Sequence, residues 1–243
     1  MMFSEDLFRK ALLDGSAQLG LEIKPLALEK MLRFTNLLLE ENKRQNLTGL
    51  VQPEEVAVKH FLDSLSCLLL PWQSELKCLD LGTGAGFPGI PLALARPRWT
   101  FLLVDSRAKR LQFLESALKE LEIDNVEVLH SRAEDAGRNP AYRGGFDLVV
   151  SRAVAHLPVL LELSIPFLKQ SGKFLALKAR DAGQELKESE LALEELGAKL
   201  EQTFPFRLPL QMGKRNLLVF VKAAATPEKY PRKAGIPLKR PLI

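Results

Sequence analysis

The sequence has few cysteines and no long uninterrupted hydrophobic segment. Cys67 and Cys78 are the only two cysteines, and neither forms a metal-ligand spacing with His60, His130 or His156. We therefore expect no metal site, and we expect both thiols to be buried core residues. No apolar run approaches the roughly 18 residues of a membrane span, and the N-terminal residues lack a secretory signal pattern. These absences predict a cytoplasmic protein with no membrane partner.

The charge is nearly balanced along most of the chain and is concentrated at the C-terminal end. Lys and Arg number 34 against 30 Asp and Glu, a formal net charge of +4. Residues 226–243 hold five cations and the single acid Glu228, so this tail carries the whole net charge. A basic segment interrupted by prolines is either solvated or lies along an acidic partner. The five cations are Lys229, Arg232, Lys233, Lys239 and Arg240.

Between residues 76 and 225, short apolar runs alternate with helical patterns. This alternation predicts a mostly parallel sheet covered by helices on both faces. Two further apolar runs near the end are close enough to form a hairpin, which completes a seven-stranded Rossmann-like α/β fold. The expected strands are 76–82, 99–105, 126–131, 146–153, 172–179, 201–211 and 215–223, and the expected helices include 106–123, 158–169 and 184–200.

Residues 1–75 have a mostly helical pattern, most clearly at 26–45 and 53–70. Too few residues remain here to bury an independent core, so we expect a helical N-terminal extension. The predicted organisation is this extension, a ligand-binding domain at 76–225 and the basic tail at 226–243.

The stretch LDLGTGAGFPGIPLA at 79–93 places a glycine-rich turn after the first predicted strand. In an open α/β sheet, this turn is where a nucleotide-like ligand binds. Starting at Gly84, the turn fits the dinucleotide pattern G-x-G-x-x-G, with Asp105 about 20 residues on. Starting at Asp80, it fits the acid-x-Gly-x-Gly-x-Gly pattern of S-adenosylmethionine enzymes.

Electrostatics favours the second interpretation of this turn. A pyrophosphate requires backbone donors and no nearby fixed negative charge, so Asp80 would oppose it. S-adenosylmethionine carries a cationic amine and a sulfonium, which a carboxylate attracts. Gly82, Gly84 and Gly86 then supply backbone freedom and close approach. A nicotinamide-dependent oxidoreductase and a glycine-rich turn without a ligand remain the alternatives.

Seven stretches together resemble the RsmG (glucose-inhibited division protein B) family of bacterial ribosomal RNA methyltransferases. They are NLTGL at 46–50, KHFLDSL at 59–65, LDLGTGAGFPGIPLA at 79–93, VDSRAKRLQFL at 104–114, SRAEDA at 131–136, DLVVSRAVA at 147–155 and YPRKAGIP at 230–237. The resemblance implies an S-adenosylmethionine-dependent methyltransferase fold. It also implies methyl transfer to N7 of a guanine, position 527 in the 530 loop of 16S ribosomal RNA. The implied partner is this RNA or the small ribosomal subunit.

The same resemblance assigns site residues. It places Gly82 and Phe87 against the cofactor, Asp105, Ser106 and Arg107 at its ribose, Ala133 and Glu134 at its adenine, and Arg152 near the reaction centre. Asp80, Gly84 and Gly86 are cofactor-binding candidates from the glycine-rich pattern alone. At the end of a strand, Asp105 can accept ribose hydroxyls; its alternative role is a helix cap or an exposed turn acid. Ser106 is also placed to cap the next helix. Glu134 could equally be an ordinary loop acid.

Two motifs of other methyltransferases are missing. An Asn-Pro-Pro-Tyr type motif, which accompanies methylation of an exocyclic adenine amine, does not follow the fourth strand. No cysteine stands at a strand end to attack a pyrimidine. Guanine N7 has a lone pair and no proton to lose, so its methylation requires positioning more than a base. Arg152 could hold a guanine O6 edge or a phosphate, or form a structural salt bridge.

Further polar residues are candidates on the same grounds. His60 and Asp63 share a helix face, and with Asn46 and Thr48 we expect them to close over the cofactor or target base; alternatively, the histidine bridges the extension to the sheet. Lys178 and Arg180 end the fifth strand, where they meet phosphate or form a solvated pair.

In the tail, we expect the five cations to contact RNA phosphates. The alternative is that Tyr230, Ile236 and Leu238 pin the tail while its cations stay solvated. A methyltransferase for another RNA or a small substrate, and a non-catalytic RNA-binding protein, remain alternative functions.

Overall fold

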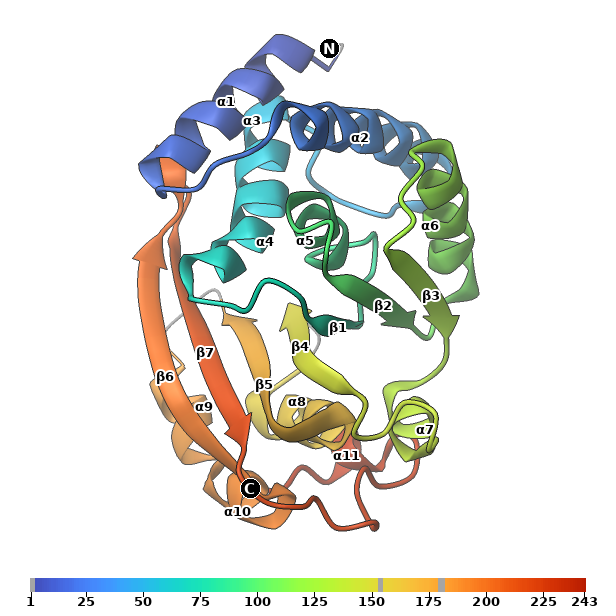
Figure 1. Ribbon diagram of the computed structural model, residues 1–243, viewed down its shortest axis with the longest axis vertical. Coiled ribbons are helices and arrows are strands. Elements are labelled where there is room, and N and C mark those ends of the chain that lie inside the picture. The colour runs from blue at the N-terminus through green and yellow to red at the C-terminus, as the bar shows by residue number, and fades with distance from the viewer. Residues whose placement is uncertain (1–2, 153–154, 179–181) are drawn as a thin grey trace.

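A seven-stranded sheet runs through the centre of the molecule in the order β3-β2-β1-β4-β5-β7-β6 (Figure 1). The computed structural model describes residues 3–152, 155–178 and 182–243. The first five strands are parallel, and β7 lies antiparallel between β5 and β6. The predicted mostly parallel seven-stranded sheet with its terminal hairpin is therefore confirmed. The strands are β1 (Lys77–Leu81), β2 (Thr100–Asp105), β3 (Val126–His130), β4 (Phe146–Arg152), β5 (Leu168–Lys178), β6 (Ala198–Arg207) and β7 (Lys214–Lys222).

Helices cover both faces of the sheet because side chains alternate along each strand. In β1, Cys78 joins the apolar cluster on one face and Leu79 joins the cluster on the other. The first face is covered by α1 (Glu5–Gln18), α2 (Pro25–Gln45), α5 (Gly89–Ala95) and α6 (Ala108–Glu120). The second face is covered by α7 (Ala133–Arg138), α8 (Leu157–Ser164), α9 (Gly183–Lys187) and α10 (Glu190–Leu196). The sheet thus has a buried core on each side.

The N-terminal helices share the core of the sheet. Phe8, Phe34 and Phe61 are all 0% exposed and belong to the same cluster as Leu103 of β2. The helix predicted at 53–70 is present as one continuous helical segment, but its middle part is π-helical. This segment comprises α3 (Pro53–Glu55), the π-helical turn η1 (Val56–Leu62), α4 (Asp63–Leu65) and the 3₁₀ turn η2 (Ser66–Leu69). Such π-helical turns often occur at functional sites.

Two local predictions were wrong. The single helix expected at 184–200 is two short helices followed by the start of β6, because Gly197 adopts a left-handed φ of +70° and ends α10. Ser106 does not cap α6. Arg107 is the N-cap residue, and its amide donates to Oδ1 of Asp105 over 2.9 Å.

The C-terminal tail is packed along the face of the sheet that carries α7 and α8 (Figure 1). Arg143 donates to the carbonyls of Tyr230 at 2.6 Å and Thr226 at 3.0 Å. Arg138 Nε donates to the carbonyl of Pro231 at 2.7 Å. A last short helix, α11 (Ile236–Lys239), contacts α8. Backbone carbonyls of the tail are therefore held by arginines of the domain.

Not all five tail cations are solvated. Lys229 pairs with Glu195 at 2.8 Å, and Arg232 pairs with Glu162 at 2.6 Å. The suggested apolar anchors also differ among themselves. Tyr230 is 5% exposed and anchors the tail, whereas Ile236 at 37% and Leu238 at 70% do not.

Candidate functional site

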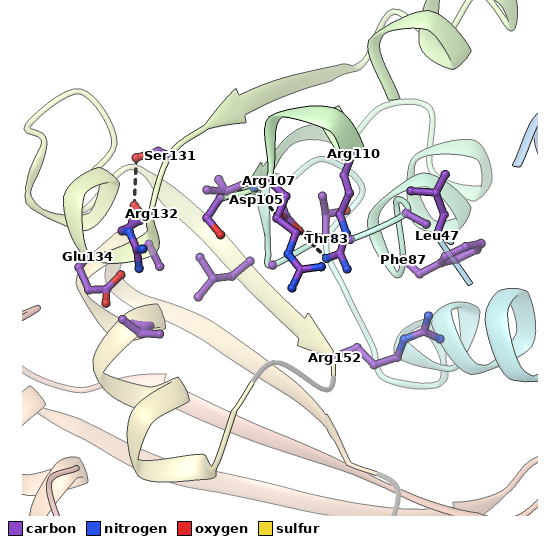
Figure 2. A pocket seen from close by; sticks show the side chains of 18 of the residues that line it. Leu47, Thr83, Phe87, Asp105, Arg107, Arg110, Ser131, Arg132, Glu134 and Arg152 are labelled. Atoms are coloured by element: carbon purple, nitrogen blue, oxygen red, sulfur yellow. Dashed lines mark hydrogen bonds and ion pairs between the residues drawn. The ribbon is translucent and has the colours of Figure 1, made fainter. Parts of the chain in front are cut away.

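A cavity of about 580 Å³ opens at the carboxyl edge of the sheet, beside the point where the strand order reverses between β1 and β4. Its walls come from the turn after β1, the end of β2, the turn after β3 and the end of β4. In Figure 2, Glu134 lies at one end and Phe87 at the other, with Asp105 and Thr83 between them. Every residue predicted to contact a cofactor lines this cavity except Asp80 and Gly86. Residues distant in sequence are thus brought together as expected.

The glycine-rich turn is fixed against the end of β2. The amides of Gly82 and Thr83 donate to the carbonyl of Val104 at 2.8 and 3.1 Å. The amide of Gly84 donates to Oδ2 of Asp105 at 3.0 Å. Gly82 and Gly84 have φ values of +72° and +60°, a region that side chains disfavour. The turn therefore exposes backbone to the cavity without a side chain in the way.

Asp80 and Gly86 lie behind the turn rather than in the cavity. The carboxylate of Asp80 is 0% exposed, and its Oδ2 accepts from Thr83 Oγ1 at 2.7 Å and Gly89 N at 2.8 Å. Its Oδ1 has no partner, and burial raises the pKa of Asp80 to about 6. A Cβ on Gly86 would lie 2.7 Å from Ile90 Cγ1. Asp80 and Gly86 therefore support the conformation of the glycine-rich turn from its buried side.

Asp105 stands at the centre of the cavity and is already partly engaged. Its carboxylate is 6% exposed and accepts from the amides of Gly84 and Arg107 and, at 3.4 Å, from Arg110 Nη1. A carboxylate has about four acceptor positions, so one remains. Asp105 can accept one hydroxyl directly, and a second only if the Arg110 contact gives way.

The turn after β3 forms the other end of the cavity. Ala133 and Glu134 begin α7 and both line the wall. Glu134 is 8% exposed, and its Oε1 accepts from the amide of Gly235 at 2.8 Å. Glu134 is therefore a buried, hydrogen-bonded carboxylate and not a solvated loop residue.

Arg152 ends β4 and turns its guanidinium toward the N-terminal helices. Nη1 donates to the carbonyl of Lys59 at 3.0 Å and to Oδ2 of Asp63 at 3.2 Å. Nη2 lies 3.3 Å from Nδ1 of His60. The guanidinium is also 5.4 Å from the centroid of the Phe87 ring, and Figure 2 shows the side chain extending toward Phe87. Arg152 therefore forms the structural ion pair that was its alternative role, and it also lines the cavity.

His60 bridges the extension to the sheet. Its ring stacks on Phe87 with centroids 4.4 Å apart, and its Nε2 lies 2.7 Å from Thr48 Oγ1. Because Arg152 can only donate, Nδ1 of His60 must accept and Nε2 carries the proton. Burial and the Arg152 charge lower the pKa of His60 to about 3. Asn46 ends α2 in a left-handed conformation with φ 51°.

Sequence reasoning missed Arg215. Its Nε donates to Oδ1 of Asp63 at 2.9 Å, so the buried carboxylate of Asp63 bridges Arg215 and Arg152. The signal that could have placed Arg215 near the site is the topology of the sheet. A strand antiparallel to its neighbour begins at the edge where the parallel strands end, which places the start of β7 beside the site.

The fifth strand ends differently from expected. Lys178 neither faces an open phosphate site nor is solvated, because its Nζ pairs with Glu185 at 2.7 Å and donates to the carbonyl of Ala155. Its side chain is 13% exposed. Arg180 lies outside the described residues.

The described residues hold no group of three or more His, Cys, Asp or Glu that could bind a metal ion. Cys67 and Cys78 are both 0% exposed, and burial raises the pKa of each thiol. Neither cysteine can therefore act as a nucleophile.

None of the helices in the described residues has the length and hydrophobicity needed to span a membrane.

The fold is that of the Rossmann-like methyltransferases. A crystal structure of an S-adenosylmethionine-dependent methyltransferase from Aquifex aeolicus superposes with a TM-score of 0.54 at 18% identity, covering 72% of this chain and 97% of that one. A family model described as "GidB: rRNA small subunit methyltransferase G" matches residues 27–213. The chain belongs to this GidB (RsmG) family.

Two relatives illustrate the match. The ribosomal RNA small subunit methyltransferase G of Desulfitobacterium hafniense is 47% identical over 226 residues, covering 93% of this chain and 94% of the relative. The protein of the same name from Carboxydothermus hydrogenoformans is 44% identical, covering 93% and 96%. Family membership confirms S-adenosylmethionine as the cofactor and excludes the oxidoreductase alternative.

Proposed function

We propose that this chain transfers the methyl group of S-adenosylmethionine to N7 of a guanine in the 530 loop of 16S ribosomal RNA. One observation carries the proposal: the residues that the family resemblance assigned to the cofactor come from four separate strand ends and meet around one cavity. The names of the relatives support ribosomal RNA as the substrate class.

The cavity fits this cofactor. Its volume lies within the range of roughly 300 to 1,000 Å³ that is usual for small-molecule sites. Asp105 offers an acceptor for a ribose hydroxyl, and Glu134 offers one at the far end for the amino group of an adenine. When bound, S-adenosylmethionine supplies an electrophilic methyl group on a sulfonium.

The side chains around the cavity are suited to positioning and not to proton transfer. Guanine N7 presents its lone pair without losing a proton, so no base is needed. With its pKa near 3, His60 stays neutral at physiological pH and cannot act as a general acid. Phe87, His60 and Arg152 instead form one wall at an end of the cavity, in which His60 stacks on Phe87 and accepts a hydrogen bond from Arg152. We infer that this wall orients the target base relative to the methyl group.

Cations are available for the RNA backbone. Arg107 and Arg132 line the cavity and are exposed, and neither has an ion-pair partner among the described residues. Phosphates neutralised by such side chains contribute much of the affinity for nucleic acid. We propose that the enzyme acts in the cytoplasm on 16S ribosomal RNA, either free or within the small ribosomal subunit.

Two measurements test the proposal. Calorimetry should show binding of S-adenosylmethionine and none of NAD. The purified protein should then transfer a labelled methyl group to unmodified 16S ribosomal RNA or small subunits, and not to 23S RNA. Cofactor binding without transfer to either form would contradict the proposed substrate and leave a non-catalytic RNA-binding protein or another methylated substrate.

A further inference from the structure

The C-terminal tail reaches the cofactor cavity at one specific atom. The amide of Gly235 donates to Oε1 of Glu134 at 2.8 Å, joining residues 101 positions apart. Oε2 of Glu134 accepts no hydrogen bond from any residue that the structure describes. One oxygen of this cavity carboxylate is therefore held by the tail, and the other is available.

The position of the Gly235 amide is set by the preceding tail residues. Arg232 binds the fully buried Glu162 through its amide at 2.8 Å and its guanidinium at 2.6 Å. Hydrogen bonds between two ionised groups, such as this guanidinium and carboxylate, are stronger than those between neutral groups. With Pro231 also held by Arg138, the chain enters the Glu134 contact from a fixed point.

Gly235 itself makes the turn that presents its amide. Its φ is +81°, and a Cβ at this position would meet nothing within 4 Å. The glycine is thus required for backbone conformation and not for close packing. Directly after it, α11 begins, and Pro237 of that helix is buried, which fixes the tail on the far side of the contact as well.

We propose that the tail completes the adenine end of the cofactor site: the Gly235 amide holds Oε1 of Glu134 so that Oε2 accepts from the adenine N6 amino group. The inference rests on the proposed function, because it takes S-adenosylmethionine as the ligand. Gly235 is a positioning residue that acts through Glu134. A glutamate side chain is flexible, and restraining it before binding reduces the entropy lost when the ligand arrives.

The test truncates the chain after Lys233. This removes the Gly235 amide but keeps Arg232 on Glu162 and Pro231 on Arg138. The matched control is the full-length variant Lys239→Gln/Arg240→Gln, which loses tail cations and keeps the amide. The probes are S-adenosylhomocysteine and S-inosylhomocysteine, in which a carbonyl replaces the N6 amino group. Calorimetry without RNA gives the dissociation constant of each.

The full-length protein should prefer the adenosine ligand, and truncation should weaken that ligand by about tenfold while changing the inosine ligand much less. Glu134→Ala should abolish the preference, and truncation in that background should cost nothing more, because coupled residues are not additive. The control variant should keep the full preference. Thermal unfolding of the ligand-free variants reports any loss of folding separately.

Equal weakening of both ligands on truncation, or additive losses in the double variant, would overturn the inference and leave the tail a packing element. Failure of the unaltered protein to bind S-adenosylhomocysteine would instead contradict the proposed function. Glu134→Gln provides a second test, since its amide carbonyl still accepts from Gly235 while its NH₂ group faces the ligand. That variant should shift its preference toward the inosine ligand, and an unchanged preference would contradict the inference.

Discussion

Arg152 at the end of β4 and Asp63 after the π-helical turn form an ion pair 3.2 Å long, with side chains 15% and 6% exposed. Arg215 at the start of β7 binds the other oxygen of the same carboxylate at 2.9 Å. One buried acid therefore ties the N-terminal extension, the central sheet and the terminal hairpin together at the edge of the cavity. The position of His60 and Phe87 depends on this junction.

Replacing Arg152 by Ala should reduce methyl transfer by roughly 100-fold or more, because displacing a reacting group by a small distance can cost that much. Cofactor affinity should change far less, since Arg152 belongs to the wall beside Phe87 and His60 and not to the ribose or adenine end of the cavity. Breaking a buried pair also destabilises, by about 3 kcal/mol or more, so unfolding must be measured alongside. Equal losses in transfer and cofactor affinity would make Arg152 a cofactor or purely structural residue. Arg152→Lys, which keeps the charge, should retain more stability than activity.

The stability of the protein should fall on acidification through His60. Its pKa is about 3 in the folded state and near 6.5 when unfolded, so only the unfolded chain gains a proton between these values. The stability that neutral His60 contributes to the folded state is fully present above pH 6.5 and is lost as the pH falls toward 3. Within that window the loss is about 1.4 kcal/mol per pH unit. Denaturant unfolding at several pH values should show a shallower pH dependence for His60→Gln. An identical dependence in both proteins would contradict the neutral, buried His60.

Asp105→Ala should weaken S-adenosylmethionine binding by about 30- to 150-fold, equivalent to roughly 2 to 3 kcal/mol. The substitution removes the ribose interaction and the support that the carboxylate gives to the amides of Gly84 and Arg107. Asp105→Asn keeps one acceptor oxygen and should lose less affinity. Calorimetry on folded variants measures both, and unchanged binding in Asp105→Ala would remove the ribose assignment.

RNA binding should depend on three tail cations. Lys233, Lys239 and Arg240 are exposed and have no ion-pair partner among the described residues, whereas Lys229 and Arg232 are paired within the protein. Changing the first three to Gln should weaken binding of the RNA and flatten its salt dependence. The expected change in log-log slope is about 0.7 for each single-strand phosphate that the variant no longer neutralises.

The control for the tail changes Lys229 to Gln, which removes a cation that already has a protein partner. It should leave the salt dependence of RNA binding nearly unchanged. If the triple variant also binds RNA with the original affinity and slope, the exposed cations do not contact phosphate. Cofactor affinity should be the same in both variants.

The succession of strands and helices along the chain and most of the cavity wall were predictable from sequence because both depend on local signals. The glycine-rich turn, the acid at the end of β2 and the alternation of apolar runs each act over a few residues. The partners of Arg152, Lys178 and Arg232 were not predictable, since Asp63, Glu185 and Glu162 reach them through packing that no sequence period encodes. The helix expected at 184–200 failed for a related reason: the hydrophobic period continues through Gly197, but the chain reverses there to pair with β7.

The most direct test of the account is nucleoside mass spectrometry of 16S ribosomal RNA. RNA or small subunits from cells that lack this chain are incubated with the purified protein and S-adenosylmethionine, digested and compared with an untreated sample, and the modified position is mapped by cleavage at 7-methylguanosine. The account predicts one new 7-methylguanosine, in the 530 loop, that is absent when the Arg152→Ala variant replaces the enzyme. A methyl group on another base or at another atom of guanine, or no new methylated nucleoside despite cofactor binding, would contradict it.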